Sequence, residues 1–175
     1  IEYDLSSGEI LTPIYRLLVD QALKEALGRN ASGKSQGRVF LFVDEFKLLP
    51  KLQHIDDALN FGRGLGVRVI AGIQSVDQLY DIYGKDRGNV LASGFGSLFA
   101  YHTNDASSRS FISERFGKNV TVFEYISAID NRAQVEMRDG QTVEDWIQLQ
   151  LGVGQAIISL GEHPPFLFQF KEYRR

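Results

Sequence analysis

The sequence contains no cysteine. That absence excludes disulfides and cysteine-ligated metal sites, and it is compatible with a cytosolic protein. No apolar run reaches the ~18 residues that a membrane-spanning helix needs, and no signal peptide is visible. The net charge of −3 supplies no global positive field, so any contact with DNA or an anionic lipid must be local.

Other simple site patterns are also absent. The histidines are isolated from one another and from any acid pair at metal-ligand spacing: His54, His102 and His163. The serines at positions 75, 93 and 97 lack the nucleophile-elbow context of a serine hydrolase. The sequence therefore predicts neither a histidine metal site nor a serine nucleophile.

The length and composition suit one globular domain. The chain has 175 residues, of which 43% are hydrophobic and 23% charged, enough for a core of ordinary size. We therefore predict a single domain over residues 1–175. The chain begins with Ile1 in mid-pattern rather than with Met, and we expect it to be a fragment.

The most informative stretch is residues 38–46, Arg-Val-Phe-Leu-Phe-Val-Asp-Glu-Phe. Its apolar run, 39–43, predicts a central strand of a parallel α/β sheet with both faces covered. The strand closes on Asp44 and Glu45, and ligands gather at the carboxyl ends of parallel strands. This is the Walker B pattern of nucleotide hydrolases, in which the first acid is held near Mg²⁺ and the second takes a proton from the attacking water. The alternative is an exposed strand end that simply carries acids.

The following segments continue an alternation of helix and strand. After a helix predicted over 52–65, residues 67–73 form a second apolar strand that ends on Gln74. The Gln74 amide can contact a phosphate or an attacking water, or it can cap the next helix, 76–83. With a third strand predicted at 97–101, the order favours right-handed βαβ units and a mostly parallel sheet.

The rest of the chain gives further predictions of secondary structure. We predict a strand over 1–5 and a helix that begins at Thr12-Pro13 and ends at Gly28. Asp105 or Thr103 is predicted to cap a further helix. The remaining predictions are extended segments at 120–125 and 133–137, a turn at Asp139-Gly140, a short helix at 142–151, and an antiparallel edge pair of 155–160 with 166–170.

Residues 28–35, Gly-Arg-Asn-Ala-Ser-Gly-Lys-Ser, match the G-x-x-x-x-G-K-[ST] phosphate-binding loop. That loop works where it leaves a strand and opens a helix, whose N-terminal N–H groups hold the phosphates. Here a predicted helix precedes the motif and a strand follows it. We therefore interpret residues 28–35, including Lys34, as a surface connector, and we expect the true phosphate-binding loop upstream.

Arg63 stands between Gly62 and Gly64, near the end of a predicted helix. A cation is favoured there by the helix dipole alone. The functional interpretation is an arginine offered across a subunit boundary to the phosphates of a neighbour. The spacing alone does not decide between these two interpretations.

Several segments together match one pattern: 39–50, 58–67, 70–79 and 102–105. Through them the chain resembles the second half of the motor domain of type IV secretion coupling proteins of the TraD/TraG type, in the FtsK/HerA group of RecA-like ATPases. The resemblance covers nearly the whole chain. It implies a partial RecA-like three-layer α/β fold with a mostly parallel sheet and an antiparallel C-terminal edge hairpin.

The resemblance also implies roles for particular residues. Asp44 resembles the Walker B acid on the Mg²⁺ side, and Glu45 the catalytic base. Gln74 resembles the polar sensor, and Arg63 a finger that acts in trans. Asp44 and Gln74 are then the expected contacts to ATP and Mg²⁺.

The family implies a hexamer at the cytoplasmic face of the membrane that uses ATP to drive DNA toward a secretion channel, with a relaxase or secreted substrate as partner. Its phosphate-binding loop and membrane anchor have no counterpart in this chain, so we expect weak ATP hydrolysis by the chain alone. Two other interpretations stay open. One is a non-catalytic RecA-like module that binds DNA or a partner protein, and the other is a secretion ATPase of the related assembly class.

Overall fold

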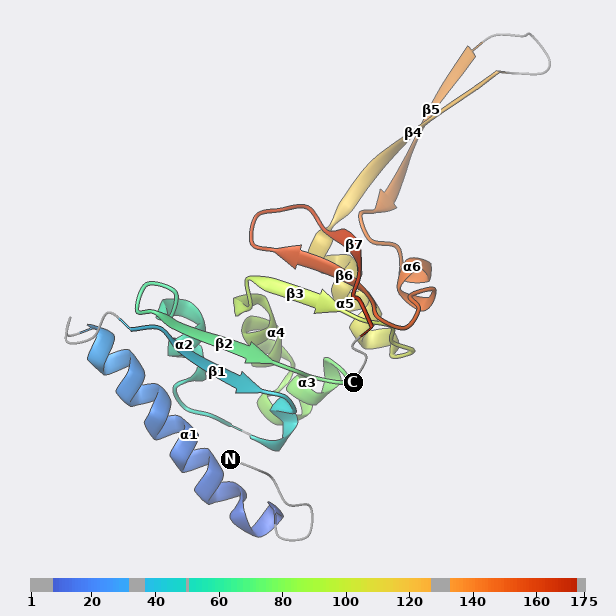
Figure 1. Ribbon diagram of the computed structural model, residues 1–175. Coiled ribbons are helices and arrows are strands. Elements are labelled where there is room, and N and C mark those ends of the chain that lie inside the picture. Colours follow the sequence, from blue (N-terminus) through green and yellow to red (C-terminus); the bar gives the residue numbers. More distant parts are fainter. Residues whose placement is uncertain (1–7, 32–36, 50, 127–132, 173–175) are drawn as a thin grey trace. The chain divides into compact units, whose positions relative to one another are not determined.

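The computed structural model describes residues 8–31, 37–49, 51–126 and 133–172. The chain divides into two compact units, Ile1–Phe95 and Gly96–Arg175, and each is described by itself (Figure 1). The α/β class is confirmed, with one parallel strand pair and two antiparallel sheets. The assignment of a single domain to the whole chain stays a prediction.

The first unit is built on a parallel strand pair. Its elements in chain order are α1 (Gly8–Ala31), β1 (Val39–Val43), η1 (Phe46–Leu48), α2 (Ile55–Phe61), β2 (Val67–Ala71), α3 (Asp77–Tyr83) and α4 (Lys85–Gly94). The two strands pair in parallel from Val39 opposite Val67 to Val43 opposite Ala71. Because parallel strands need a crossover, α2 connects them and packs against β2.

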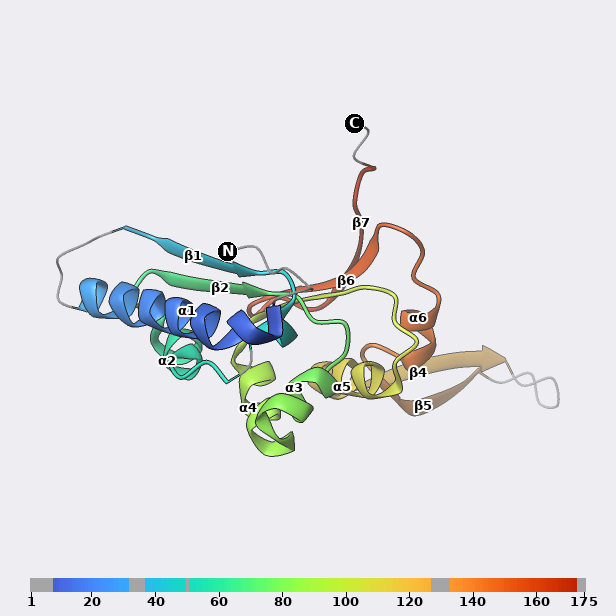
Figure 2. The same cartoon turned by 90° about the horizontal axis from the view of Figure 1, so that it is seen from below.

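One face of this strand pair carries the core. Phe46, Leu52 and Ile55 are at most 1% exposed and anchor the segment between β1 and α2. The α1 helix joins this core through Val19 and Leu23, both buried. Figure 2 shows α1 and α2 on the same side of the strand pair.

The prediction that both faces of β1 are covered is wrong for the described residues. Phe40 and Phe42 are 53% and 70% exposed, and Ile70, opposite Phe42, is 48% exposed. A continuous apolar run shows that both faces of a strand are apolar, but it does not show that the chain supplies cover for both.

The predicted ends of α1 are also wrong. The helix is continuous from Gly8, and the Thr12 hydroxyl donates to the Gly8 carbonyl (2.8 Å) instead of capping a helix start. Gly28 lies inside the helix, which continues to Ala31. The predicted strand at 1–5 lies outside the described residues.

Another predicted helix, 52–65, is shorter in the structure. The α2 helix covers only 55–61, because Gly62 is its C-cap and the Gly62 carbonyl accepts the first N–H of β2, from Val67 (2.8 Å).

The second unit contains the antiparallel pairings. Its elements are β3 (Ser97–Ala100), α5 (Ala106–Phe116), β4 (Lys118–Ile126), β5 (Ala133–Gln141), α6 (Asp145–Leu149), β6 (Gln155–Leu160) and β7 (Phe166–Gln169). The β3, β6 and β7 strands form one antiparallel sheet in that order. The predicted antiparallel pair near the C-terminal end is therefore confirmed as β6 and β7. Parallel pairing is confirmed for β1 and β2, whereas β3 pairs antiparallel with β6.

The β4 and β5 strands form a separate two-stranded ribbon (Figure 1). Pairing runs from Lys118 opposite Gln141 to Ile126 opposite Ala133. The turn predicted at Asp139-Gly140 is wrong, since both residues lie inside β5 opposite residues of β4. An Asp-Gly pair favours a turn only where the chain must reverse, and here β4 supplies a partner on either side of it.

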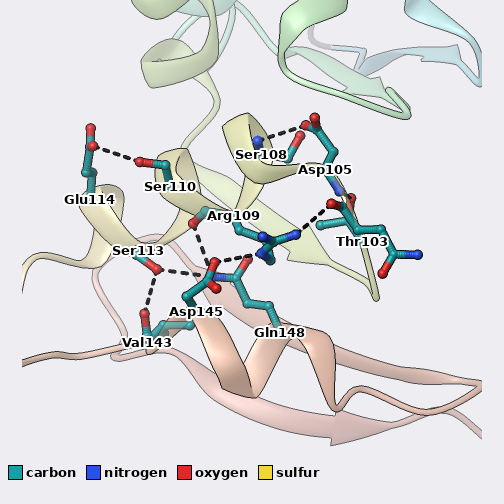
Figure 3. A network of polar contacts seen from close by, with 11 residues as sticks. Thr103, Asp105, Ser108, Arg109, Ser110, Ser113, Glu114, Val143, Asp145 and Gln148 are labelled. Carbon is teal, nitrogen blue, oxygen red and sulfur yellow. Dashed lines mark hydrogen bonds and ion pairs between the residues drawn. The ribbon is translucent and has the colours of Figure 1, made fainter.

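A buried polar network joins α5 to α6 (Figure 3). Gln148 is fully buried, and its amide donates to the Arg109 carbonyl and the Ser113 hydroxyl, both at 3.1 Å. Ser113 in turn donates to the Val143 carbonyl (2.8 Å). The Arg109 guanidinium is bound to Asp145 (2.6 Å), so this cation stabilises the unit rather than standing free on a helix face.

The N-terminus of α5 is capped as predicted. The Asp105 carboxylate accepts the Ser108 N–H at 2.8 Å. We expect Asp105→Ala to lower the free energy of unfolding of this unit by about 1 kcal/mol, because the N–H loses its acceptor. Asp105→Asn, which keeps an oxygen acceptor, serves as the control. Urea unfolding followed by the fluorescence of Trp146, the single tryptophan, measures the difference, and equal stability of Asp105→Ala and the parent sequence would contradict the assignment.

Candidate functional site

The carboxyl ends of β1 and β2 bring two predicted site residues into contact. Glu45 follows β1 and Gln74 follows β2, and because the strands are parallel both lie at the same edge. The Gln74 amide nitrogen donates to Glu45 Oε2 at 3.0 Å. Residues 29 positions apart in sequence therefore form one polar group.

Backbone hydrogen bonds hold this edge together beyond the last paired strand residues. The Gly72 N–H donates to the Val43 carbonyl (2.8 Å), and the Phe46 N–H donates to the Gly72 carbonyl (2.9 Å). A Cβ at Gly72 would lie 2.3 Å from the carbonyl oxygen of Asp44. Only glycine therefore lets β2 pass this close to the Asp44 backbone.

Phe46 fixes the other side of the acid pair. Its side chain is 1% exposed, and its ring stacks on that of Tyr83 with centroids 6.3 Å apart. Asp44 and Glu45 are thus held between two buried residues, Val43 and Phe46. The sequence motif indicated the acids, but neither Gly72 nor Tyr83 carried a signal that marked it as part of their support.

The two acids differ in their surroundings. Asp44 is exposed, whereas Glu45 is partly buried and its Oε1 atom is buried without a hydrogen-bond partner among the described residues. A buried acceptor without a partner costs free energy, and a water or another donor placed there would remove that cost. The arrangement is suited to receiving a proton donor at Oε1 while Gln74 occupies Oε2.

The donor set fits Mg²⁺ better than a metal enclosed by protein ligands. No group of three or more His, Asp or Glu side chains that could hold a metal occurs in the described part of the chain. Mg²⁺ keeps several waters and is bound through one or two carboxylates together with substrate phosphates. The exposed Asp44 carboxylate meets that requirement.

Gln74 does not cap the helix that follows it. Its side chain points to Glu45, and its own backbone N–H donates to Gln78 Oε1 (3.2 Å). Ser75 Oγ accepts the N–H of Asp77 at 3.1 Å. The alternative interpretation of Gln74 as a cap is therefore wrong, because Gln78 and Ser75 bind the backbone at this turn.

Arg63 lies away from these residues. It belongs to the loop before β2, at the amino end of the strand, whereas Gln74 follows the carboxyl end. Five strand residues at about 3.3 Å each separate the two ends. The structure thus brings Glu45 and Gln74 together and keeps Arg63 from the same edge.

The loop that carries Arg63 is itself well fixed. Arg68 Nη1 donates to the carbonyls of Val67 (3.0 Å) and Arg63 (3.1 Å). A Cβ at Gly62 would lie 2.1 Å from the Ala58 carbonyl oxygen. Arg63 is exposed and forms no ion pair within the described ranges. Sequence reasoning missed Arg68, which carried no motif.

The phosphate-loop letters at 28–35 fall partly outside the described residues. Gly28 to Ala31 lie in α1, and β1 begins at Val39. The first four residues of the motif are therefore helical, and the order of helix before strand is the one that the sequence predicted. Lys34 and Ser35 lie outside the described residues.

Comparison with known proteins defines the class and then the family. The fold is that of a RecA-like α/β protein, as a solved conjugative coupling protein, TrwB, shows: TM-score 0.84, 26% sequence identity, with 98% of this chain and 40% of that chain covered. Residues 1–155 match the family described as type IV secretion-system coupling protein DNA-binding domain. The chain belongs to this family of type IV coupling proteins.

Curated relatives agree with this assignment. VirD4 of Agrobacterium fabrum is 26% identical over 171 residues, which cover 94% of this chain and 25% of that protein. A probable conjugal transfer protein TraG of Sinorhizobium fredii is 24% identical over 128 residues, 73% of this chain and 20% of that protein. The chain therefore spans a quarter or less of these relatives. Within the described residues, no helix is both long enough and apolar enough to cross a membrane.

We expect Gly72→Ala to disrupt the candidate site. The added methyl group would meet the Asp44 carbonyl at 2.3 Å, so the strand ends must separate, at a cost of roughly 1–3 kcal/mol as for other overpacked sites. Hydrogen exchange of the Phe46 amide, whose acceptor is the Gly72 carbonyl, should accelerate. Gly64→Ala is the matched control, since its Cβ would meet only the Phe61 carbonyl at 3.6 Å. Unchanged Phe46 protection in Gly72→Ala would contradict this description of the strand edge.

Proposed function

We propose that this chain supplies part of the ATPase site of a type IV coupling protein, which uses ATP to drive DNA toward a secretion channel. The observation that carries the proposal is the contact between Glu45 and Gln74 at the ends of two parallel strands. Solved structures of TrwB in complex with the ATP analogue ADPNP and with ADP and Mg²⁺ support it. The phosphate-binding loop then comes from a part of the protein outside this sequence.

In this proposal the two adjacent acids have different tasks. Asp44, exposed at the strand end, holds Mg²⁺, and the bound ion neutralises charge on the phosphates. Glu45 accepts the proton of the attacking water. Its Oε1 atom has no protein partner among the described residues, and a general base must have an oxygen within reach of that proton.

Gln74 is proposed to orient the base. Its amide nitrogen is committed to Glu45 Oε2, which leaves Oε1 for the water and restricts rotation of the carboxylate. The Gln74 carbonyl oxygen and the exposed position of the side chain allow a further contact to the water or the γ-phosphate, the role of a polar sensor.

Arg63 is proposed to act on the site of a neighbouring subunit. It lies at the opposite end of β2 from Gln74, so it is poorly placed to serve its own site. Its exposure and its fixed loop suit an arginine presented to a partner. This proposal requires a ring, for which the hexamer of the FtsK/HerA group is the expected form, at the cytoplasmic face of the membrane with a relaxase or secreted substrate as partner.

A second candidate is a non-catalytic RecA-like module that binds DNA or a partner protein. The observation in its favour is that Gly28 lies inside α1. A phosphate-binding loop follows a strand and precedes a helix, and residues 28–35 do not have that context. The same experiment separates the two candidates.

The test is subunit mixing in the full-length coupling protein that we propose carries this chain. Glu45→Gln and Arg63→Ala should each reduce DNA transfer by about 100-fold or more, since a general base and an arginine finger each contribute at least that much. Co-expression of the two variants should restore part of the transfer. A site that combines Glu45 from one subunit with Arg63 from the other is intact.

The matched control is a mixture of Glu45→Gln with Gln74→Ala. Both changes lie in the same half of the site, so no combination of subunits repairs it and transfer should stay low. Full transfer by Glu45→Gln alone would favour the non-catalytic module. Failure of the Glu45→Gln and Arg63→Ala mixture to recover would contradict the trans role of Arg63.

A further inference from the structure

The first unit contains a cavity of about 660 Å³ whose charged lining residues are all cationic. They come from three places in the chain: Arg16 on α1, Lys51 in the turn before α2, and Arg87 on α4. The chain as a whole carries a net charge of −3. This cavity is therefore a local concentration of cations, which can attract a polyanion to a chain without a global positive field.

Two acids near the cavity, Asp20 and Asp56, are already engaged. Asp20 is 7% exposed, and one of its carboxylate oxygens accepts the backbone N–H groups of Gln53 (2.7 Å) and His54 (3.2 Å). Asp56 is paired with Arg87. Neither carboxylate lines the cavity.

The three cations differ in how firmly they are already bound. Arg16 approaches Asp20 only to 3.9 Å, which is at the limit of an ion pair. Lys51 is exposed and has no ion pair in the part of the chain that the structure describes. Its backbone has a φ of 58°, the left-handed region that residues with a Cβ seldom occupy. Lys51 thus brings a cation without an ion pair to the cavity, and Arg16 brings one whose partner, Asp20, also accepts two backbone N–H groups.

Tyr83 forms a rigid polar wall. Its hydroxyl accepts the Leu52 N–H (3.2 Å), and the Arg87 guanidinium lies 5.3 Å from the centre of its ring. Burial raises the pKa of Tyr83, so the hydroxyl keeps its proton and can donate it to an acceptor. Gly84 also lines the cavity and is the N-cap of α4, whose first N–H groups have no side-chain cap.

We propose that this cavity binds a phosphate group of the DNA backbone through Lys51 and Arg16. Two cations, a hydroxyl donor and an uncapped helix end are groups that bind phosphate. The Tyr83 ring already packs with Phe46 and Arg87. The other apolar lining residues are Leu52, which is fully buried, and Ile82, so the cavity offers little free surface for a nucleotide base. The inference deepens the proposed function, on which it rests, by placing a DNA contact away from Glu45 and Gln74.

The test is fluorescence anisotropy of a labelled single-stranded oligonucleotide, titrated with the chain over a series of salt concentrations. Lys51→Ala and Arg16→Gln should each weaken binding by about 3- to 10-fold. Each should also reduce the slope of log K against log salt by about one, because one phosphate contact is lost. Lys24→Ala, an exposed lysine on α1 that does not line this cavity, is the matched control and should change neither quantity.

Arg87 is left intact, since a substitution there would also remove its ion pair with Asp56 and its contact with Tyr83. Urea unfolding of Lys51→Ala and Arg16→Gln should match that of the parent sequence. Titrations with ATP and with inorganic phosphate identify the source of the phosphate. Displacement of DNA by either one at concentrations near that of the protein would assign the cavity to a free ligand and overturn the proposal.

The failure of this inference differs from a failure of the proposed function. If the parent sequence binds DNA and both variants bind equally well, the cavity is not a DNA contact while the proposed ATPase site is unaffected. If the parent sequence binds no DNA even at low salt, the inference is overturned. The proposed function then no longer includes a DNA contact made by this chain.

Discussion

The candidate site depends on the backbone bonds that keep β1 and β2 joined beyond their last paired residues. Gly72 donates to Val43 and accepts from Phe46, and no residue with a Cβ fits so close to the Asp44 carbonyl. This constraint fixes the distance between the two strand ends, and therefore the contact between Glu45 and Gln74. The buried ring of Phe46 prevents the acid pair from moving away from the sheet. The chemistry proposed for the two acids follows from this rigid edge.

The same strand pair also keeps Arg63 away from Glu45 and Gln74. Gln74 and Arg63 flank β2 on opposite ends, so one chain presents its acids at one edge and its arginine at the other. The proposed action of Arg63 in trans uses this division, because in a ring of identical subunits each arginine edge can face the acid edge of a neighbour. Arg68, bound to the Arg63 carbonyl, holds the arginine loop in place.

Sequence patterns predicted the strands and the polar residues of this site, but not the residues that surround them. An apolar run followed by Asp44 and Glu45, and a second run followed by Gln74, indicate parallel strands with polar ends, and the structure has both. The cover of the strands could not be predicted, because Phe42 is apolar whether or not another segment packs on it. Asp139-Gly140 gave the signal of a turn, yet it lies inside β5, because strand pairing with β4 overrides local propensity. Contacts such as Arg68 with Arg63, or Gln148 with Ser113, depend on the tertiary arrangement and leave no trace in the spacing of residues.

The central claim is that Asp44 binds Mg²⁺ and that Glu45 accepts the proton of the attacking water. The most direct measurement compares Mg²⁺-dependent ATP binding and ATP hydrolysis by the full-length coupling protein carrying Glu45→Gln or Asp44→Asn. We predict that Glu45→Gln binds ATP nearly as well as the parent protein but hydrolyses it about 100-fold more slowly or worse, and that Asp44→Asn loses the dependence of binding on Mg²⁺. Hydrolysis by Glu45→Gln at the parent rate, or Mg²⁺ dependence that survives in Asp44→Asn, would contradict this account.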